Sequence, residues 1–455
     1  MASTIEDLRT ASRGQVIGPE DSEYDEARTV LNAMIDRRPS VILRAAEVDD
    51  VVAAVNHARD NRLPLAIRGG GHSVPGFGTV DGGVVIDLAA MREVTVDPSA
   101  RTARAQGGAT WAGFNDATHA HGLATTGGFV STTGVGGLTL GGGIGYLTRA
   151  VGLSCDNLVE AAVVTADGRT VRASEEENDD LFWAIRGGGG NFGVVTEFTF
   201  ALHPVTQVYG GPMFFELTHG PDLLRFFRDF MADAPEELAM FPAFQIAPPL
   251  PFIPEERHGD VFIAMVACWT GAVEEGERIL QPLHDVAPVV AEHVGVAPYP
   301  ALNSAFDGLY PPGLQHYWKT SFATEVSDAA IDVHMEYGPK VPAVNATMHI
   351  YAINGAVQRV APEATAFAYR DATFVTNIAG MWPNPADNGD NVRWVRGYYD
   401  ALAPHSEEGG YVNFMSGDDH DRMRATYRGN FDRLVEVKRR YDPENLFRVN
   451  QNIAP

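Results

Sequence analysis

A single histidine, His72, directly follows three glycines, and its type and position suit covalent or proton-transfer chemistry. A neutral imidazole nitrogen is a competent nucleophile near pH 7. Glycines let a ligand approach the main chain closely, because they carry no side chain. The turn 69–72 follows a short apolar run, 65–67, which we expect to be a buried strand. The pattern predicts an imidazole held against a bound ligand; the alternative is a histidine that only caps its own turn.

Three glycine clusters lie between residues 69 and 193, at 69–71, 134–145 and 187–193, each beside a short predicted strand. One such cluster would predict only a tight turn. Three together favour a main-chain cradle for a large anionic ligand. The segment 141–145 lacks the βαβ context and the acidic residue about 20 positions later that the G-x-G-x-x-G dinucleotide fold requires. A different nucleotide-binding fold is therefore expected.

The charge balance of the chain restricts its partners. The 455 residues include 34 Lys and Arg against 59 Asp and Glu, a net charge of −25. Nucleic acids and anionic membrane surfaces bind basic patches, so neither is an expected partner. A dinucleotide cofactor is still allowed, because main-chain N–H groups can hold a pyrophosphate without net positive charge.

Metal and serine-hydrolase chemistry find no support in the sequence. The two cysteines, Cys155 and Cys268, lie far apart, and the 14 histidines form no H-E-x-x-H motif. No G-x-S-x-G elbow is present, and we expect no metal site. Residues 1–13 are polar and no apolar stretch reaches the about 18 residues of a membrane span, so we expect a soluble, cytoplasmic protein.

The elements that would position these residues suggest an α+β protein with two domains. Valines at 48, 51, 52 and 55 predict an amphipathic helix that ends near Asn61. We expect strands at 65–67, 84–88, 93–96, 102–105, 161–165, 170–172 and 194–200. Glycine thins out near residue 205, and strands and helices then alternate, such as a strand at 261–269 and a helix at 273–280. The expected division is 1–205 for cofactor binding, 206–404 for substrate binding on an antiparallel sheet, and 405–455 returning to the first domain.

Four motifs resemble one family of flavoproteins, in the same order along the chain. Residues 68–73 (RGGGHS) resemble the R-x-G-G-H-S/N signature of the vanillyl-alcohol-oxidase superfamily, whose flavin domain is of the PCMH type. The runs 134–157, 183–193 and 441–451 resemble the G-V-G-G, W-A-I-R-G-G-G and Y-D-P-x-N-x-F…N-Q segments of its berberine-bridge-enzyme-like branch. The 6-hydroxynicotine oxidases are near relatives in that resemblance. Residues 205–400 carry it much more weakly.

The resemblance implies FAD as cofactor, bound covalently from its 8α position to His72. Such a bond would anchor the flavin and favour hydride acceptance. Some relatives add a second bond from a cysteine, whose position here is Val130, so a single bond is expected and Cys155 and Cys268 are expected to be ordinary buried thiols. The other cofactor-binding residues that it implies are Arg68, Gly69, Gly70, Gly71, Ser73, Gly76, Thr133, Gly134, Gly136, Gly137, Gly141, Gly142, Gly143, Gly145, Asp156, Gly193, Val194 and Asn450.

The expected reaction is hydride transfer from a C–O or C–N bond of a small molecule to flavin N5. In the family the side chain at Thr133 gates dioxygen, and threonine leaves an oxidase that makes hydrogen peroxide plausible. The alternatives are a flavin dehydrogenase with another acceptor, and a flavoprotein that binds a drug or metabolite without turnover. The substrate stays open among sugars, alcohols, amines and polyketides, and the protein could be a monomer or a homodimer.

Two segments supply candidate catalytic residues. Residues 411–414 (YVNF) resemble a family segment in which the tyrosine, here Tyr411, is often the base and the asparagine, Asn413, lies near the flavin. The pKa of Tyr411 would then have to fall from about 10; the alternative is a tyrosine packed in the core. Strand alternation puts His349 and Tyr351 on one face, over the flavin in the family; the alternative is a face turned to solvent. A glutamate base found in some relatives falls on Val375, so alkaloid-type ring closure is not expected. Residues 317–319 are a third, weaker candidate.

Overall fold

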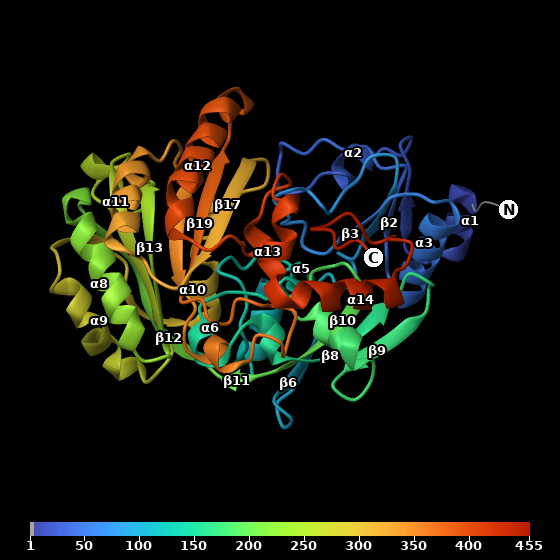
Figure 1. The fold of residues 1–455 in the computed structure, drawn as a ribbon, viewed down its shortest axis with the longest axis horizontal. Helices are drawn as coiled ribbons and strands as arrows, with labels where there is room; N and C mark the ends of the chain where they lie inside the picture. Colours follow the sequence, from blue (N-terminus) through green and yellow to red (C-terminus); the bar gives the residue numbers. More distant parts are fainter. Residues whose placement is uncertain (1–3) are drawn as a thin grey trace.

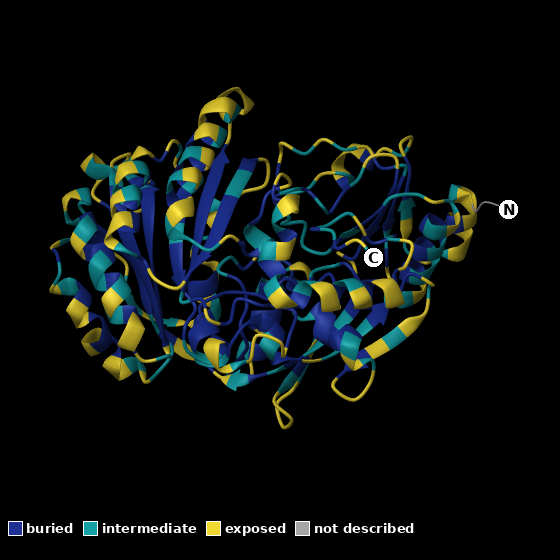
Figure 2. Ribbon diagram, in the orientation of Figure 1, coloured by how far each residue is buried: buried dark blue, intermediate teal, exposed yellow. Residues whose placement is uncertain are grey.

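The computed structural model describes residues 4–455 as two lobes lying side by side (Figure 1). One lobe holds a mixed, mainly parallel sheet with α1 and α3, and the other holds an antiparallel sheet with α8, α11 and α12. The central strands are buried, while the helices that cover them expose their outer sides and edge strands such as that at 170–174 are partly exposed (Figure 2). Within the described residues, no helix is long and apolar enough to cross a membrane. The α+β class is confirmed.

The first sheet has four strands in the order β1-β2-β4-β3. Its strands are β1 (Gln15–Ile17), β2 (Val41–Arg44), β4 (Val84–Asp87) and β3 (Leu65–Arg68). Strands β2 and β3 run parallel to β4 and are almost continuously apolar, as expected for strands covered on both faces. Helix α3 (Val48–Asp60) covers one face with a buried stripe of Val51, Ala54, Val55 and Ala58, which confirms the predicted amphipathic helix. Helix α1 (Ile5–Ala11) packs on α3, and the short α2 is Tyr24–Ala27.

The second sheet is antiparallel, with five strands in the order β5-β6-β10-β8-β9. Its strands are β5 (Val94–Asp97), β6 (Thr102–Gln106), β10 (Val194–Ala201), β8 (Leu158–Val164) and β9 (Thr170–Ser174), and a small pair joins β7 (Leu123–Ala124) to β11 (His203–Pro204). The predicted hairpin is the β8–β9 pair. Trp111 and Phe114 of α4 (Trp111–His119) pack on Phe200 of β10. The other helices of this lobe are α5 (Val135–Leu140), α6 (Thr148–Val151) and α7 (Asp179–Ile185).

The third sheet is antiparallel and has eight strands, in the order β15-β12-β14-β13-β18-β19-β17 with β16 beside β12. Its strands are β12 (Gln207–Phe215), β13 (Leu238–Ile246), β14 (Val261–Trp269), β15 (Val289–Glu292), β16 (Gly295–Pro298), β17 (Gln315–Ala323), β18 (Thr347–Ala352) and β19 (Phe374–Trp382). The helices of this lobe are α8 (Gly220–Asp233), α9 (Gly276–His284), α10 (Tyr299–Ser304), α11 (Asp328–Tyr337) and α12 (Asn388–Leu402). The helix predicted at 273–280 starts as a 3-10 turn and becomes α-helical only from Gly276.

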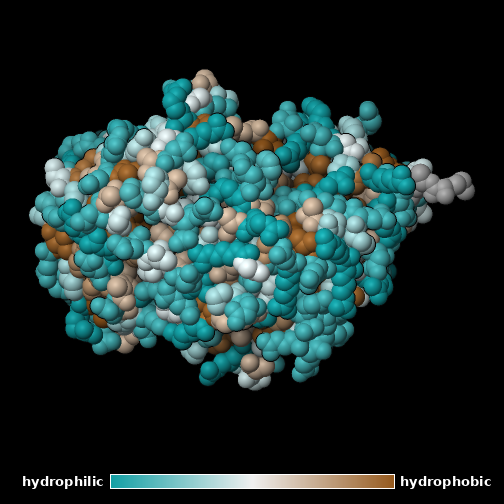
Figure 3. All heavy atoms as spheres, in the orientation of Figure 1, coloured by the Kyte–Doolittle hydropathy of each residue, from teal (hydrophilic) through white to brown (hydrophobic). Residues whose placement is uncertain are grey.

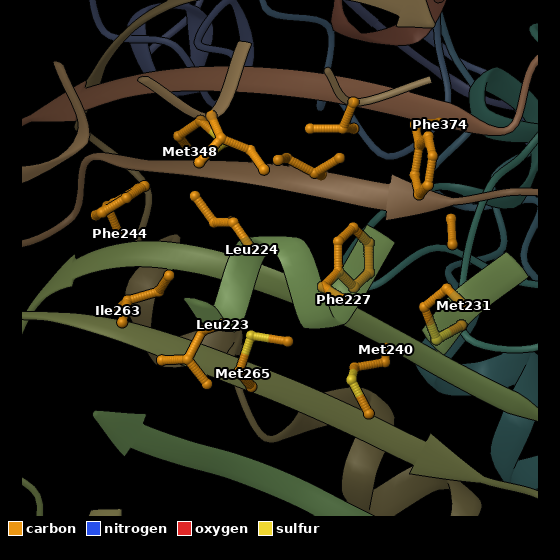
Figure 4. Close-up of a cluster of buried hydrophobic side chains, with 14 of the residues drawn as sticks. Leu223, Leu224, Phe227, Met231, Met240, Phe244, Ile263, Met265, Met348 and Phe374 are labelled. Atoms are coloured by element: carbon orange, nitrogen blue, oxygen red, sulfur yellow. The ribbon is translucent and has the colours of Figure 1, made fainter. Parts of the chain in front are cut away.

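The outer face of this sheet forms the largest core cluster. Leu223, Leu224, Phe227 and Met231 of α8 point onto apolar side chains of four strands (Figure 4). The strand residues labelled there are Met240, Phe244, Ile263, Met265, Met348 and Phe374. Because strand side chains alternate, His349 and Tyr351 point to the inner face, toward the first lobe.

Two features tie the lobes together. The C-terminal helices α13 (Met423–Tyr427) and α14 (Phe431–Tyr441) cross back to the first lobe, where α14 packs on α7. Buried Arg149 of α6 reaches the C-terminal end of α8, where it donates hydrogen bonds to the carbonyls of Met231, Ala234, Pro235 and Leu238. Its Nε also donates to Asn354 Oδ1 at 2.8 Å. One side chain therefore binds carbonyls in the last turn of α8 and in the segment that leads from it to β13.

The surface carries no large apolar patch in the view of Figure 3, which is mostly hydrophilic with scattered apolar residues. The large apolar side chains exposed among the described residues are dispersed along the chain: Met34, Val159, Leu250, Val296 and Val344. Single exposed apolar residues of this kind are ordinary.

Candidate active site

A cavity of about 290 Å³ lies between the glycine-rich loops of the first lobe and the inner face of the antiparallel sheet. Fourteen of the predicted site residues line it: Arg68, Gly69, Gly70, Gly71, His72, Ser73, Thr133, Gly134, Gly136, Gly137, Gly193, Tyr351, Asn413 and Asn450. Segments separated by more than 300 residues thus meet around one space.

His72 enters this cavity as a neutral imidazole. Burial lowers the pKa of His72 to about 4, and the nearby carboxylate of Asp307 opposes the shift. At neutral pH a ring nitrogen therefore keeps a free lone pair, the form that can act as a nucleophile. The hydroxyl of Thr133 lies 3.4 Å from His72 Nδ1.

The loop that carries His72 is fixed to the other lobe by buried Asn32. The Nδ2 of Asn32 donates to the carbonyls of Val74 at 2.6 Å and His316 at 3.0 Å, and its Oδ1 accepts from the N–H of His316 at 3.0 Å. His316 lies on β17, so one amide joins the His72 loop to the sheet edge. The side chain of Arg37 holds the same loop, through the carbonyls of Gly76 and Thr79.

Two glycines are required where the His72 loop meets the second glycine run. A Cβ added at Gly134 would overlap the backbone nitrogen of Gly70, and a Cβ at Gly70 would overlap the nitrogen of Gly134. The two loops therefore touch main chain to main chain, which only residues without side chains allow.

We expect Gly134→Ala to destabilise the protein by about 1–3 kcal/mol, because a rigid backbone must move to admit the methyl group. Gly113→Ala is the matched control: this exposed helical glycine has nothing within 4 Å of the added methyl, and alanine there gains up to about 1 kcal/mol of helix propensity. Thermal unfolding of the two variants gives the comparison. Equal melting temperatures for them would contradict the close contact.

Several predicted cofactor residues do not line the cavity. The carboxylate of Asp156 binds the buried guanidinium of Arg370 through two hydrogen bonds of 2.8 and 2.6 Å and accepts the N–H of Leu153. Val194 points into an apolar cluster, although its neighbours Gly193 and Val195 face the cavity. Gly76 packs against Ile35. These residues lie behind the ones that line the cavity.

The glycines at 141, 142, 143 and 145 also lie outside the cavity lining. A Cβ at Gly141 would overlap the side chain of Asn413, and a Cβ at Gly145 would overlap the carbonyl of Gly127. Direct contact between this run and the cofactor stays a prediction. These glycines let distant segments approach closely.

Tyr411 occupies a different environment from the one a flavin-side base requires. Its hydroxyl oxygen accepts the N–H of Gly143 at 2.9 Å, the N–H of Ile144 at 3.2 Å and Asn413 Nδ2 at 2.8 Å. The side chain is buried outside the cavity lining, and burial raises the pKa of Tyr411 above its ordinary value. It holds Asn413, which does reach the cavity and also donates to the carbonyl of Leu138.

Tyr351 and His349 form a hydrogen-bonded pair on the inner face of β18. The Tyr351 hydroxyl lies 2.7 Å from His349 Nδ1. Tyr351 lines the cavity and is only 5% exposed, so this face does not turn to solvent. Its ring stacks on Phe129 with centroids 4.1 Å apart. Burial lowers the pKa of His349 to about 3, which keeps its imidazole neutral.

Several lining residues were not among the predicted site residues, because the motifs point to other positions in their segments, as at 411–414, or because no motif covers them. Phe129, Tyr310, Asn377 and Phe414 face the cavity. Of the third candidate segment, only Trp318 does so, while its neighbours Tyr317 and Lys319 bind Asp418 at 2.7 and 2.9 Å. Strand alternation at 317–319 was the one available signal for Trp318.

The C-terminal segment closes the far wall of the cavity around a buried ion pair. Lys438 Nζ contacts Asp442 Oδ2 at 2.7 Å, and both side chains are 0% exposed. The same ammonium donates to the carbonyls of Asn191 and Phe447, each at 2.8 Å. Asp442 also accepts the N–H groups of Leu446 and Phe447. The pair thus holds the third glycine cluster against the end of the chain.

Metal binding and thiol chemistry are the other possibilities for this chain. Within residues 4–455, no group of three or more His, Cys, Asp or Glu side chains is placed to hold a metal ion. Both Cys155 and Cys268 are buried free thiols whose pKa burial raises, as expected for inert core cysteines.

Comparison with known proteins identifies the family. Residues 39–174 match an FAD-binding domain, and residues 410–454 match the "berberine and berberine like" segment. The FAD-linked oxidoreductase YgaK of Bacillus subtilis is 34% identical over 98% of both chains, and the (R)-6-hydroxynicotine oxidase of Paenarthrobacter nicotinovorans is 30% identical over 97% of both. The crystal structure of 6-hydroxy-D-nicotine oxidase from Arthrobacter nicotinovorans superimposes with a TM-score of 0.87 at 26% identity, covering 100% of each chain. The chain therefore belongs to the FAD-linked oxidoreductases of the vanillyl-alcohol-oxidase superfamily, in its berberine-bridge-enzyme-like branch.

Proposed function

We propose that this oxidoreductase is an oxidase whose single covalent flavin bond is made by His72, and that it oxidises a C–O or C–N bond of a small organic molecule. The observation that carries the proposal is the cavity itself, in which a neutral imidazole and three main-chain glycine loops face an aromatic wall.

The lining fits a large polar ligand such as FAD. Four of its polar atoms are buried without a hydrogen-bond partner in the described structure: Trp318 Nε1, Asn377 Oδ1, Tyr427 Oη and Asn450 Oδ1. Buried polar groups are normally satisfied, so these atoms call for a ligand or water in the cavity. The exposed main chain at Gly69, Gly70 and Gly190 suits phosphate groups, which backbone N–H groups can bind.

When bound, FAD supplies the hydride acceptor and passes two electrons to dioxygen, which gives hydrogen peroxide. The protein's own residues hold the cofactor and orient the substrate. His72 tethers the ring system, and Asn32 fixes the loop that carries it. Phe129 and Tyr351 provide a stacked aromatic wall for the substrate. Tyr351, rather than Tyr411, takes the substrate proton, because only Tyr351 lines the cavity.

A single bond to the flavin follows from the side chains at hand. Val130 lines the cavity at the position where some relatives have a cysteine, and valine carries no nucleophile. Cys155 and Cys268 lie outside the lining. Thr133 faces the cavity beside His72 with a small side chain, which leaves room for dioxygen. The relative named as a hydroxynicotine oxidase supports the same reaction type.

The flavin bond is tested by replacing His72 with alanine. We expect wild-type protein precipitated with acid to keep its yellow colour, and His72→Ala to release all flavin into the supernatant, because no cysteine and no second histidine of the described residues lines the cavity. The exposed His420→Ala is the control and should behave as wild type. Covalent flavin in His72→Ala would refute the assignment. Hydrogen peroxide formed in air on substrate addition distinguishes an oxidase from a dehydrogenase.

A further inference from the structure

The cavity side of β18 carries a chain of hydrogen bonds that extends beyond Tyr351 and His349. His349 Nε2 lies 3.3 Å from Thr347 Oγ1, and Thr347 Oγ1 lies 3.1 Å from the carbonyl oxygen of Phe244 on β13. Thr347 is 2% exposed, so no water competes for its hydroxyl. Four groups on two neighbouring strands are thus connected in series.

The direction of each bond follows from counting protons. A carbonyl oxygen only accepts, so Thr347 donates its one hydroxyl proton to Phe244. The Thr347 oxygen must then accept from His349 Nε2–H. In a neutral ring this leaves Nδ1 as the acceptor, which receives the hydroxyl proton of Tyr351. The Tyr351 oxygen therefore offers its lone pairs to the cavity.

We propose that Thr347 is a positioning residue that fixes this tautomer of His349, and that the series Tyr351–His349–Thr347 accepts the hydroxyl proton of an uncharged alcohol substrate. The inference rests on the proposed function and narrows its choice between C–O and C–N bonds to C–O.

The proposed oxidation of the alcohol balances in protons and electrons. The alcohol loses its carbinol C–H bond as a hydride to the flavin and its O–H proton to the Tyr351 oxygen, and a C=O bond forms. Tyr351 at the same time passes its own proton to His349 Nδ1, and the Nε2–H bond to Thr347 offsets part of the burial penalty that lowers the pKa of the His349 imidazolium. Reduction of dioxygen to hydrogen peroxide consumes two electrons and two protons: the hydride taken from the alcohol would supply both electrons and one proton, and His349 would supply the other proton.

The cavity walls favour a neutral substrate. Among the described residues, no Asp, Glu or Lys side chain lines the cavity, and the one arginine that does, Arg68, is bound to Asp87 at 2.8 Å. An ammonium group would enter without a counter-charge, which is costly in a buried site. A neutral amine has a nitrogen lone pair that can assist hydride loss, so it does not require a proton acceptor, whereas an alcohol does.

The titratable groups that face the series Tyr351–His349–Thr347 are uncharged as well. Tyr146 and Tyr310 are the titratable side chains that act on Tyr351, and both have pKa values raised by burial. Phe241 packs on both Tyr351 and His349, with ring centroids 5.0 and 5.3 Å apart. The aromatic surroundings suit an alcohol carried on a flat, apolar body.

The tautomer is tested without any substrate. Histidine labelled with ¹⁵N, with the His349 signals assigned by their loss in His349→Gln, reports which ring nitrogen carries the proton at pH 7. We expect Nε2–H in the wild type and in Thr347→Ser, and a mixture of tautomers in Thr347→Val, which cannot accept the bond. An Nδ1–H ring or a doubly protonated ring in the wild type would overturn the proposal.

The substrate class is tested on the flavin-loaded enzyme without oxygen, with size-matched panels of alcohols and amines. We expect bleaching of the flavin by alcohols only. With the best alcohol, Thr347→Val should lower kcat about tenfold with little change in KM, and Thr347→Ser should restore it. Bleaching by amines alone or by no alcohol, or an unchanged kcat in Thr347→Val, overturns the inference. Protein that binds no flavin would instead refute the proposed function.

Discussion

Replacing Lys438 with methionine should lower the free energy of unfolding by about 3–5 kcal/mol, the usual cost of removing one partner from a buried ion pair. Lys438 and Asp442 are both fully buried, so the variant leaves a carboxylate without its counter-ion. The carbonyls of Asn191 and Phe447 also lose their donor. Both residues line the cavity, so we expect less complete incorporation of the flavin as well.

Urea denaturation of the purified protein measures this effect, with Arg439→Met as the control. Arg439 is the next residue of α14 and is exposed. Its replacement by methionine removes the same positive charge and leaves a side chain of the same type. We expect its midpoint to stay near that of the wild type, because exposed charges contribute little. Coupling is checked with Asp442→Asn: the double variant should lose less than the sum of the single variants. Strict additivity would show that the two groups act independently.

Tyr351→Phe should lower kcat by about 10²- to 10⁴-fold, the range for loss of a positioned proton acceptor. The change removes one oxygen atom and keeps the ring that stacks on Phe129. Because the apolar contact remains, KM should change little. Stopped-flow reduction of the flavin under anaerobic conditions measures the step directly.

Two other tyrosines make the Tyr351 result specific. Tyr146→Phe removes a hydroxyl from the same aromatic cluster, outside the cavity lining, and should leave kcat near the wild-type value. Tyr411→Phe removes the acceptor of three N–H groups, so we expect lower stability and a smaller fall in kcat. A larger kcat loss in a folded Tyr411→Phe than in Tyr351→Phe would restore Tyr411 as the candidate base.

The sequence predicted best what depends on local pattern. The apolar stripe of α3 and the β8–β9 hairpin depend on nearest neighbours, and both were confirmed. His72 and the glycines beside it could be assigned to the cavity because the turn itself has a recognisable signature. The α+β class also followed from local alternation of strands and helices.

What the sequence could not predict depends on partners that lie far apart in the sequence. Asp156 was expected to bind the cofactor, yet its carboxylate is satisfied by Arg370, 214 residues later. The glycine at 141 is required by the side chain of Asn413, a contact that no local pattern reveals. Trp318 and Phe414 reach the cavity only because β17 and the C-terminal segment pack beside it. Such pairings are set by tertiary packing, which periodicity does not encode.

The contact between Arg149 and the end of α8 has a consequence for how such enzymes diversify. The guanidinium comes from the cofactor-binding half, but the carbonyls it satisfies belong to the substrate-binding half. If the substrate-binding half came from a relative in which this helix ends differently, Arg149 would be a buried cation without its acceptors. The carbonyls at the end of the helix would lose the guanidinium as a donor. An exchange of substrate specificity between relatives must therefore transfer Arg149 together with the segment that it binds. Otherwise it must proceed by single substitutions on the inner face of the antiparallel sheet.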